Sequence, residues 1–139
     1  MLRNALLLIS RLLFAAMFVP SGLQALSNIA GTTSYFAGLG LPSPMLAAWG
    51  TGLFELIAGL LILVGLQTRI AALLLAAFCI VAGFIGHYGQ GDDPTLAFLH
   101  SQMLMKDIAI SGGFLALAMA GAGAWSIDGR NFGVGAEAT

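Results

Sequence analysis

Residues 44–66 read PMLAAWGTGLFELIAGLLILVGL and carry a single charged residue, Glu55, in an otherwise mostly apolar run. A helix needs about 20 mostly apolar residues to cross a hydrocarbon core of about 30 Å, so this stretch is long enough to span a membrane. It is rich in Leu and Ala and does not alternate between apolar and polar residues, as a strand of a membrane barrel would. The stretch therefore predicts a transmembrane helix.

Three further runs, from about residue 4 to 26, from 69 to 88 and from 99 to 121, support the same prediction. Residues 27–44 hold three glycines and two prolines, too many for one long helix. Apolar side chains within that segment predict a short element at the membrane surface: Ile29, Tyr35, Phe36 and Leu39. We therefore expect an all-α integral membrane four-helix bundle, in one domain over residues 1–139, with an interfacial element between spans one and two.

The composition excludes several classes of protein. Charged residues make up 8% of the chain and hydrophobic residues 59%, whereas a soluble domain carries about 25% charged residues. A soluble enzyme, a disordered tail and a nucleic-acid binder are thereby excluded, the last because it needs a basic patch. The single cysteine, Cys79, excludes an intramolecular disulfide, a CxxC redox pair and a cysteine zinc site.

The basic residues predict the orientation in the membrane. Arg3 precedes the first span, Arg69 lies between the second and third, and Arg130 follows the fourth. Because positive residues collect on the cytoplasmic side, we expect both termini in the cytoplasm. Arg11 interrupts the first apolar run and no small-x-small cleavage site follows it, so we expect a retained anchor and not a cleaved leader.

Glu55 is the most informative polar residue, because it lies about 16 Å from either end of its span at 1.5 Å per residue. Its helical neighbours are mostly small residues, which let helices approach closely, so we expect its side chain to point into the bundle. It is either ionised and paired with Arg11 or Lys106, or protonated, because burial disfavours a carboxylate. A structural ion pair and a proton-handling or cofactor-binding group both remain open.

Five other polar residues lie in or at the ends of the spans: Arg11, His87, His100, Lys106 and Asp107. Arg11 can extend back to the interface or pair with Glu55. Lys106 and Asp107 are adjacent, so they lie about 100° apart on a helix and need separate partners. With His87 and His100 they are candidates to line a polar pocket that opens to the outer side.

A metal site is not expected, because two histidines without a local spacing motif indicate one only weakly. The same two side chains, His87 and His100, become candidate haem ligands only where the outer ends of spans three and four converge. The sequence leaves that convergence open, and haem with it.

Several segments together resemble one family of proteins. They are the Arg11-Leu-Leu-Phe and Pro20-Ser-Gly-Leu-Gln segments of span one, Tyr35-Phe-Ala-Gly-Leu-Gly-Leu-Pro-Ser-Pro after it, the run from Glu55 to Thr68-Arg69, His87, and Trp125-Ser-Ile-Asp-Gly-Arg after span four. This ordered set resembles the DoxX family of small four-span bacterial membrane proteins over roughly residues 3 to 132. The resemblance implies a multi-pass protein of the bacterial inner membrane.

The DoxX family is described as membrane-associated oxidoreductase components, related to the DoxD-type subunit of thiosulfate:quinone oxidoreductase. By this resemblance Arg11, Glu55 and His87 match recurring polar positions, and they are the candidate functional residues, with Glu55 handling protons. Lys106 and Asp107 stand in a span whose polar positions vary more among relatives. A quinone is the implied cofactor, and lipid and other membrane or redox subunits are the implied partners.

Three functions compete at this point. The first is a quinone-linked subunit in which Glu55 manages protons and Arg11, Lys106 or His87 hydrogen-bonds a quinone held among the spans. The chain has no flavin, iron–sulfur or nucleotide motif, so any chemistry requires a bound cofactor or a partner. The second is a non-catalytic anchor or assembly subunit, and the third a carrier or proton path for a small solute. Whether the chain is itself an enzyme, and whether it forms a homo-oligomer, stays open.

Overall fold

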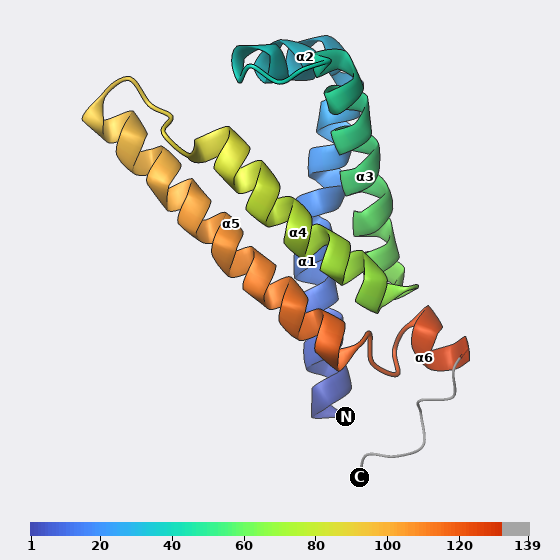
Figure 1. Ribbon diagram of the computed structural model, residues 1–139. Helices are drawn as coiled ribbons and strands as arrows, with labels where there is room; N and C mark the ends of the chain where they lie inside the picture. The colour runs from blue at the N-terminus through green and yellow to red at the C-terminus, as the bar shows by residue number, and fades with distance from the viewer. Residues whose placement is uncertain (132–139) are drawn as a thin grey trace.

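The computed structural model describes residues 1–131, and residues 132–139 of the predicted domain lie outside the described part (Figure 1). The elements in chain order are α1 (Leu2–Ser27), α2 (Ile29–Gly38), α3 (Pro44–Val64), α4 (Thr68–His87), α5 (Pro94–Ala120) and α6 (Ile127–Asn131). α1, α3, α4 and α5 are each long and apolar enough to cross a membrane. The prediction of an all-α membrane bundle is confirmed.

The helix ends follow from local capping. α5 begins at Pro94, earlier than the predicted residue 99, because the Asp93 carboxylate accepts a hydrogen bond from the Leu96 N–H at 2.9 Å and proline suits the first helical position. α3 ends at Val64 and is capped by Gly65, whose positive φ of 70° lets its N–H donate to the Leu61 carbonyl at 2.9 Å. α2 is the short element expected between the first two spans.

The four long helices form two pairs, α1 with α3 and α4 with α5. α1 and α3 touch through backbone at Gly22, where a Cβ would come within 2.6 Å of the Leu56 nitrogen. α4 and α5 are joined by the Ser111 hydroxyl, which donates to the Ala76 carbonyl at 2.9 Å. Figure 1 shows that the pairs converge at the end where α1 begins and diverge toward α2.

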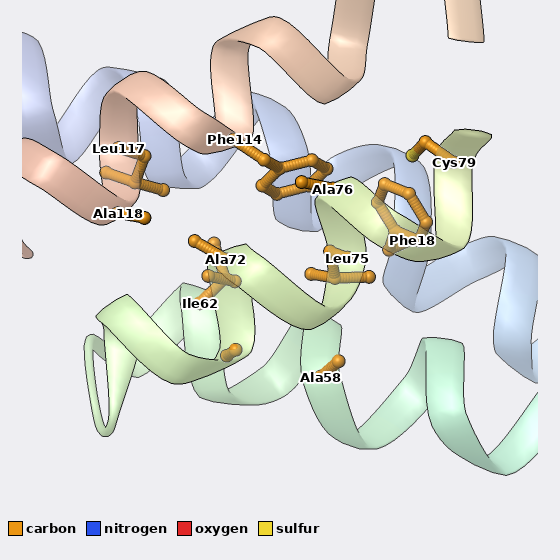
Figure 2. Close-up of a cluster of buried hydrophobic side chains, with 11 residues drawn as sticks. Phe18, Ala58, Ile62, Ala72, Leu75, Ala76, Cys79, Phe114, Leu117 and Ala118 are labelled. Carbon is orange, nitrogen blue, oxygen red and sulfur yellow. The ribbon is translucent and has the colours of Figure 1, made fainter. Parts of the chain in front are cut away.

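The apolar core lies where the two pairs converge. Phe114 of α5 stacks on Phe14 of α1, with ring centroids 4.0 Å apart, and contacts Phe18 edge-on at 5.5 Å. Figure 2 shows Phe18 and Phe114 in one cluster with Leu75 of α4 and Ile62 of α3, which are both fully buried. Outward-facing positions carry large exposed apolar side chains, as lipid-facing surfaces require.

Two arginines cap α5 at this converging end. Arg69 Nη1 donates to the Ala118 and Met119 carbonyls at 2.9 and 2.8 Å, and Arg3 Nη2 donates to the Ala120 carbonyl at 3.0 Å. The last carbonyls of a helix have no partner within it, and cations also complement the negative end of its dipole. The predicted grouping of Arg3 and Arg69 at one end is observed, whereas the compartment that this end faces stays a prediction.

Asp128 of α6 caps α4 from a distant part of the chain. Its two carboxylate oxygens accept hydrogen bonds from the Gln67 and Thr68 N–H groups, each at 2.9 Å. The Asp128 N–H in turn donates to the Gly65 carbonyl at 2.8 Å. Hydrogen bonds therefore hold α6 against the turn between α3 and α4, at the converging end of the bundle.

Candidate functional site

A cavity of about 600 Å³ lies between the diverging pairs, and residues from all five of the helices α1 to α5 line it. Its walls are mostly apolar and include Phe18, Phe36 and Phe78. Its polar lining consists of six side chains: Ser21, Tyr35, Thr51, Glu55, His87 and Asp107. The site is therefore an apolar chamber at membrane depth with a few polar groups, the usual character of a small-molecule site.

Glu55 lies on the α3 wall of this cavity, as the small-residue face predicted. Its side chain is half-buried, and its Oε2 atom is buried without a hydrogen-bond partner. The Ser21 hydroxyl of α1 is its side-chain neighbour. Within residues 1–131 no salt bridge joins Glu55 to Arg11 or Lys106, so the predicted structural ion pair is wrong. An oxygen left unpartnered in an apolar wall is available to a ligand or a proton.

Asp107, His87 and His100 form a chain that leads from the cavity toward the end of the α4–α5 pair. His87 Nε2 lies 3.7 Å from Asp107 Oδ2, and His87 Nδ1 lies 2.9 Å from His100 Nδ1, one nitrogen donating to the other. Asp107 and His87 line the cavity, whereas His100 adjoins it through His87. Of the four residues that were candidates to line one polar pocket, His87 and Asp107 line this cavity, and His100 contacts His87 outside the lining.

Gly83 makes room for this chain. A Cβ at Gly83 would lie 2.9 Å from both the Cβ and the Oδ2 of Asp107, so only a glycine lets α5 bring that carboxylate against α4. Gly83 and His87 are four residues apart and thus share one face of α4. The spacing holds Asp107 and His87 on the same side of the cavity.

α2 covers the cavity on the side away from the core. Tyr35, Phe36 and Leu39 line it from α2 and its C-terminal end. The Tyr35 hydroxyl lies near Gly86 of α4, since a Cβ there would come 3.4 Å from the oxygen. Sequence reasoning placed Tyr35 at the membrane surface and missed its role in the lining, as it missed Ser21 and Thr51. The available signal was the set of apolar side chains in this segment, which includes Phe36 and Leu39.

Arg11 does not line the cavity, contrary to its prediction as a cofactor-binding residue. Its side chain is 2% exposed. It donates to the Ile62 and Leu63 carbonyls at the end of α3, at 3.0 and 2.7 Å, and to the Ala122 and Trp125 carbonyls after α5, at 3.1 and 2.8 Å. The guanidinium supplies hydrogen-bond donors to four backbone carbonyls that would have no donor in lipid or in an apolar core. Of the two expected alternatives, the pair with Glu55 is not formed in residues 1–131, whereas the side chain does extend to acceptors at the converging end of the bundle.

Lys106 also differs from its prediction. Its side chain is exposed on the outer surface of α5 and is not part of the cavity lining. Because Asp107 turns inward, the neighbouring residue, about 100° away around the helix, turns outward. Lys106 therefore faces lipid or another protein, and not the site.

The two histidines do not fit a haem held between them. Their Nδ1 atoms are 2.9 Å apart and bonded to each other, which leaves no room for an iron and its porphyrin between the rings. In the described residues no group of three or more His, Cys, Asp or Glu side chains could hold a metal ion.

Comparison with known proteins places this geometry in context. The DoxX family model matches residues 6–88, the part that supplies Arg11, Glu55 and His87, and ends before α5. The chain is 38% identical over 121 residues to inner membrane protein YqjF of Escherichia coli (strain K12), covering 87% of this chain and 88% of YqjF. It is 35% identical over 133 residues to inner membrane protein YphA of the same organism, covering 92% and 91%.

A more partial match links the chain to a protein with a named activity. CatD of Bacillus subtilis (strain 168), whose name assigns it provisionally to the oxidoreductases, is 38% identical over 69 residues, half of each chain. No solved structure matches the chain at a significant level. The relatives that cover most of the chain are thus described by their membrane location.

Proposed function

The chain belongs to the DoxX family of inner-membrane proteins, and on that premise we propose that it is the quinone-binding membrane subunit of a redox complex. The observation that carries the proposal is the membrane-depth cavity that is lined both by Glu55, which has an unpartnered oxygen, and by the Asp107–His87 pair. The oxidoreductase name of CatD supports the redox part of it.

The lining fits a quinone head group, which is a flat apolar ring with two carbonyl oxygens. A volume of about 600 Å³ is in the range of cavities that hold small cofactors. The aromatic walls suit the ring, and His87 and the Ser21 and Tyr35 hydroxyls can donate hydrogen bonds to its oxygens. Arg11 and Lys106, earlier candidates for that task, lie outside the cavity and take no part.

Reduction of a quinone takes up two electrons and two protons. In this proposal, residues of the chain hold and donate the two protons. Glu55 holds one beside Ser21 at the α3 wall. Asp107 and His87 hold or pass the other, and His100 continues that path toward the end of the bundle. The electrons come from a reduced partner protein, because the sequence has no flavin, iron–sulfur or nucleotide motif.

The test is to purify the chain from native membranes in mild detergent and to measure the quinone bound per chain by mass spectrometry. Glu55→Gln keeps the size of the side chain and removes its acid. The matched control is Asp92→Asn, which changes an exposed loop carboxylate that does not line the cavity. We expect quinone in the wild type and in the control, and its loss in Glu55→Gln at unchanged helicity. Wild-type protein that retains partner subunits but no quinone would refute the proposal.

A second candidate function, a non-catalytic assembly subunit, is favoured by Lys106. This exposed cation lies about 18 Å along α5 from Pro94 at 1.5 Å per residue, too deep for its stem to reach water readily, and a lone charge at such depth costs several kcal/mol. Gln102 lies one turn away on the same exposed face. On this function the wild type should retain partner subunits but no quinone, and Lys106→Met should release those subunits, whereas Met105→Leu, a neighbouring exposed position, should release none.

A further inference from the structure

A second cavity, of about 260 Å³, lies at the converging end of the bundle and shares no lining residue with the first. Its lining comes from the start of α1, the start of α4, the segment after α5, and α6. Two of its lining residues are cations, Arg3 and Arg69, and one is an anion, Asp128. Neither the family resemblance nor the proposed function assigns it a role.

The two arginines keep hydrogen-bonding capacity beyond their caps on α5. Each guanidinium has five N–H donors, and Arg3 uses Nη2 alone while Arg69 uses Nη1 alone among the described hydrogen bonds. The Arg69 guanidinium packs closely against Gly121, where a Cβ would come 3.3 Å from Nη2. Free guanidinium edges of this kind bind phosphate in bidentate fashion.

The other polar groups of this cavity favour an anion as well. Both oxygens of Asp128 already accept hydrogen bonds, from the Gln67 and Thr68 N–H groups, so its charge is spread into the start of α4. Thr68 is fully buried, yet its Oγ1 atom has no hydrogen-bond partner. A buried hydroxyl without a partner is uncommon, and it is explained where a ligand supplies the missing acceptor.

We propose that this cavity binds the phosphate group of an anionic phospholipid, held between Arg3 and Arg69 with the Thr68 hydroxyl as an additional donor. Basic pockets between membrane helices commonly bind such head groups. A water-soluble phosphate offers the same chemistry, so the test must separate the two sources. A bound phosphate would bridge the start of α1 to the α4–α5 pair and strengthen the closed end of the bundle.

The test uses the fluorescence of Trp125, an exposed residue just after α5, in full-length protein carrying Trp49→Phe. The protein is placed in vesicles of phosphatidylcholine with increasing brominated phosphatidylglycerol, or with brominated phosphatidylcholine at the same fraction. We expect phosphatidylglycerol to quench at a lower fraction. Arg3→Gln and Arg69→Gln should each lower that preference about fivefold, the equivalent of about 1 kcal/mol per basic residue at an anionic surface.

Two further variants keep the result interpretable if an arginine variant unfolds. Thr68→Val keeps the shape and removes the unpartnered hydroxyl, so it should lower the preference without lowering stability. Arg130→Gln removes an exposed charge of α6 that does not line the cavity and should leave the preference unchanged. An equal loss in Arg130→Gln, or equal quenching by both lipids in the wild type, would overturn the proposal.

The source of the phosphate is decided by a competition arm. Inorganic phosphate or glycerol phosphate is added to vesicles that contain phosphatidylglycerol. Unchanged quenching at millimolar concentrations identifies the lipid as the ligand and supports the proposal. Loss of the lipid preference at those concentrations overturns the lipid assignment and shows that the site takes a soluble phosphate.

Discussion

The two ends of the bundle use their charged side chains in opposite ways. At the converging end, Arg3, Arg11, Arg69 and Asp128 all bind backbone groups that helix ends leave without partners. At the diverging end, Glu55 has an unpartnered oxygen, and Asp107 reaches no partner closer than His87 at 3.7 Å. Charged side chains at the first end therefore hold helix ends together, whereas those at the second end are the ones on which the proposed quinone site depends.

The largest loss of stability is expected for Arg11→Met. Methionine has a similar length but no donors, so four carbonyls lose their hydrogen bonds in a buried position. We expect a loss of about 2–4 kcal/mol, since unsatisfied buried groups cost about 1–3 kcal/mol each and some of them can relax. Unfolding by sodium dodecyl sulfate, followed by circular dichroism, measures it. Arg11→Lys should recover part of the loss, and an unchanged unfolding midpoint in Arg11→Met would contradict the assignment.

A glycine pair separates packing at the site from helix propensity. Gly83→Ala places a Cβ 2.9 Å from the Asp107 side chain, so we expect a loss of about 1–3 kcal/mol from overpacking and weaker quinone retention. Gly112 has open space where its Cβ would lie, so Gly112→Ala should stabilise α5 by up to about 1 kcal/mol without changing retention. The same unfolding assay and the quinone measurement test both. Equal effects at the two positions would show that the contact with Asp107 does not cause the effect of Gly83→Ala.

A smaller effect is expected for Asp128→Ala, which uncaps the start of α4. Loss of a helix cap costs about 0.5–2 kcal/mol, and here two N–H groups lose their acceptor. Thermal unfolding in detergent measures it, with Asp92→Asn as the control for loss of a carboxylate in a loop. A midpoint that shifts no more than that of the control would show that the contact of α6 contributes nothing.

The sequence allowed the spans to be predicted because apolar length is a local property of the chain. The inward direction of Glu55 also followed, since small residues at helical spacing mark its face. The partners of Arg11 did not follow, because backbone carbonyls leave no trace in residue identity and lie 51 to 114 positions away. The inward turn of Asp107 and the outward turn of Lys106 were likewise undetermined, because adjacency fixes only the angle between them.

The candidate site was predicted in part for a related reason. Glu55, His87 and Asp107 are charged or titratable residues in apolar spans, which makes them conspicuous. Tyr35 and Ser21 are ordinary in an interfacial helix and a first span, and only the fold of α2 and α1 around the cavity gives them a place in it. The need for glycine at position 83 could not be predicted, because it depends on the contact with Asp107 of another helix.

The most direct test measures bound quinone per chain and the unfolding midpoint on the same preparations of wild type, Glu55→Gln and Asp128→Ala. The account predicts that Glu55→Gln loses quinone at an unchanged midpoint, and that Asp128→Ala keeps quinone at a lowered midpoint. Full quinone retention in Glu55→Gln, or joint loss of quinone and stability in both variants, would contradict the division between a structural end and a ligand-binding end.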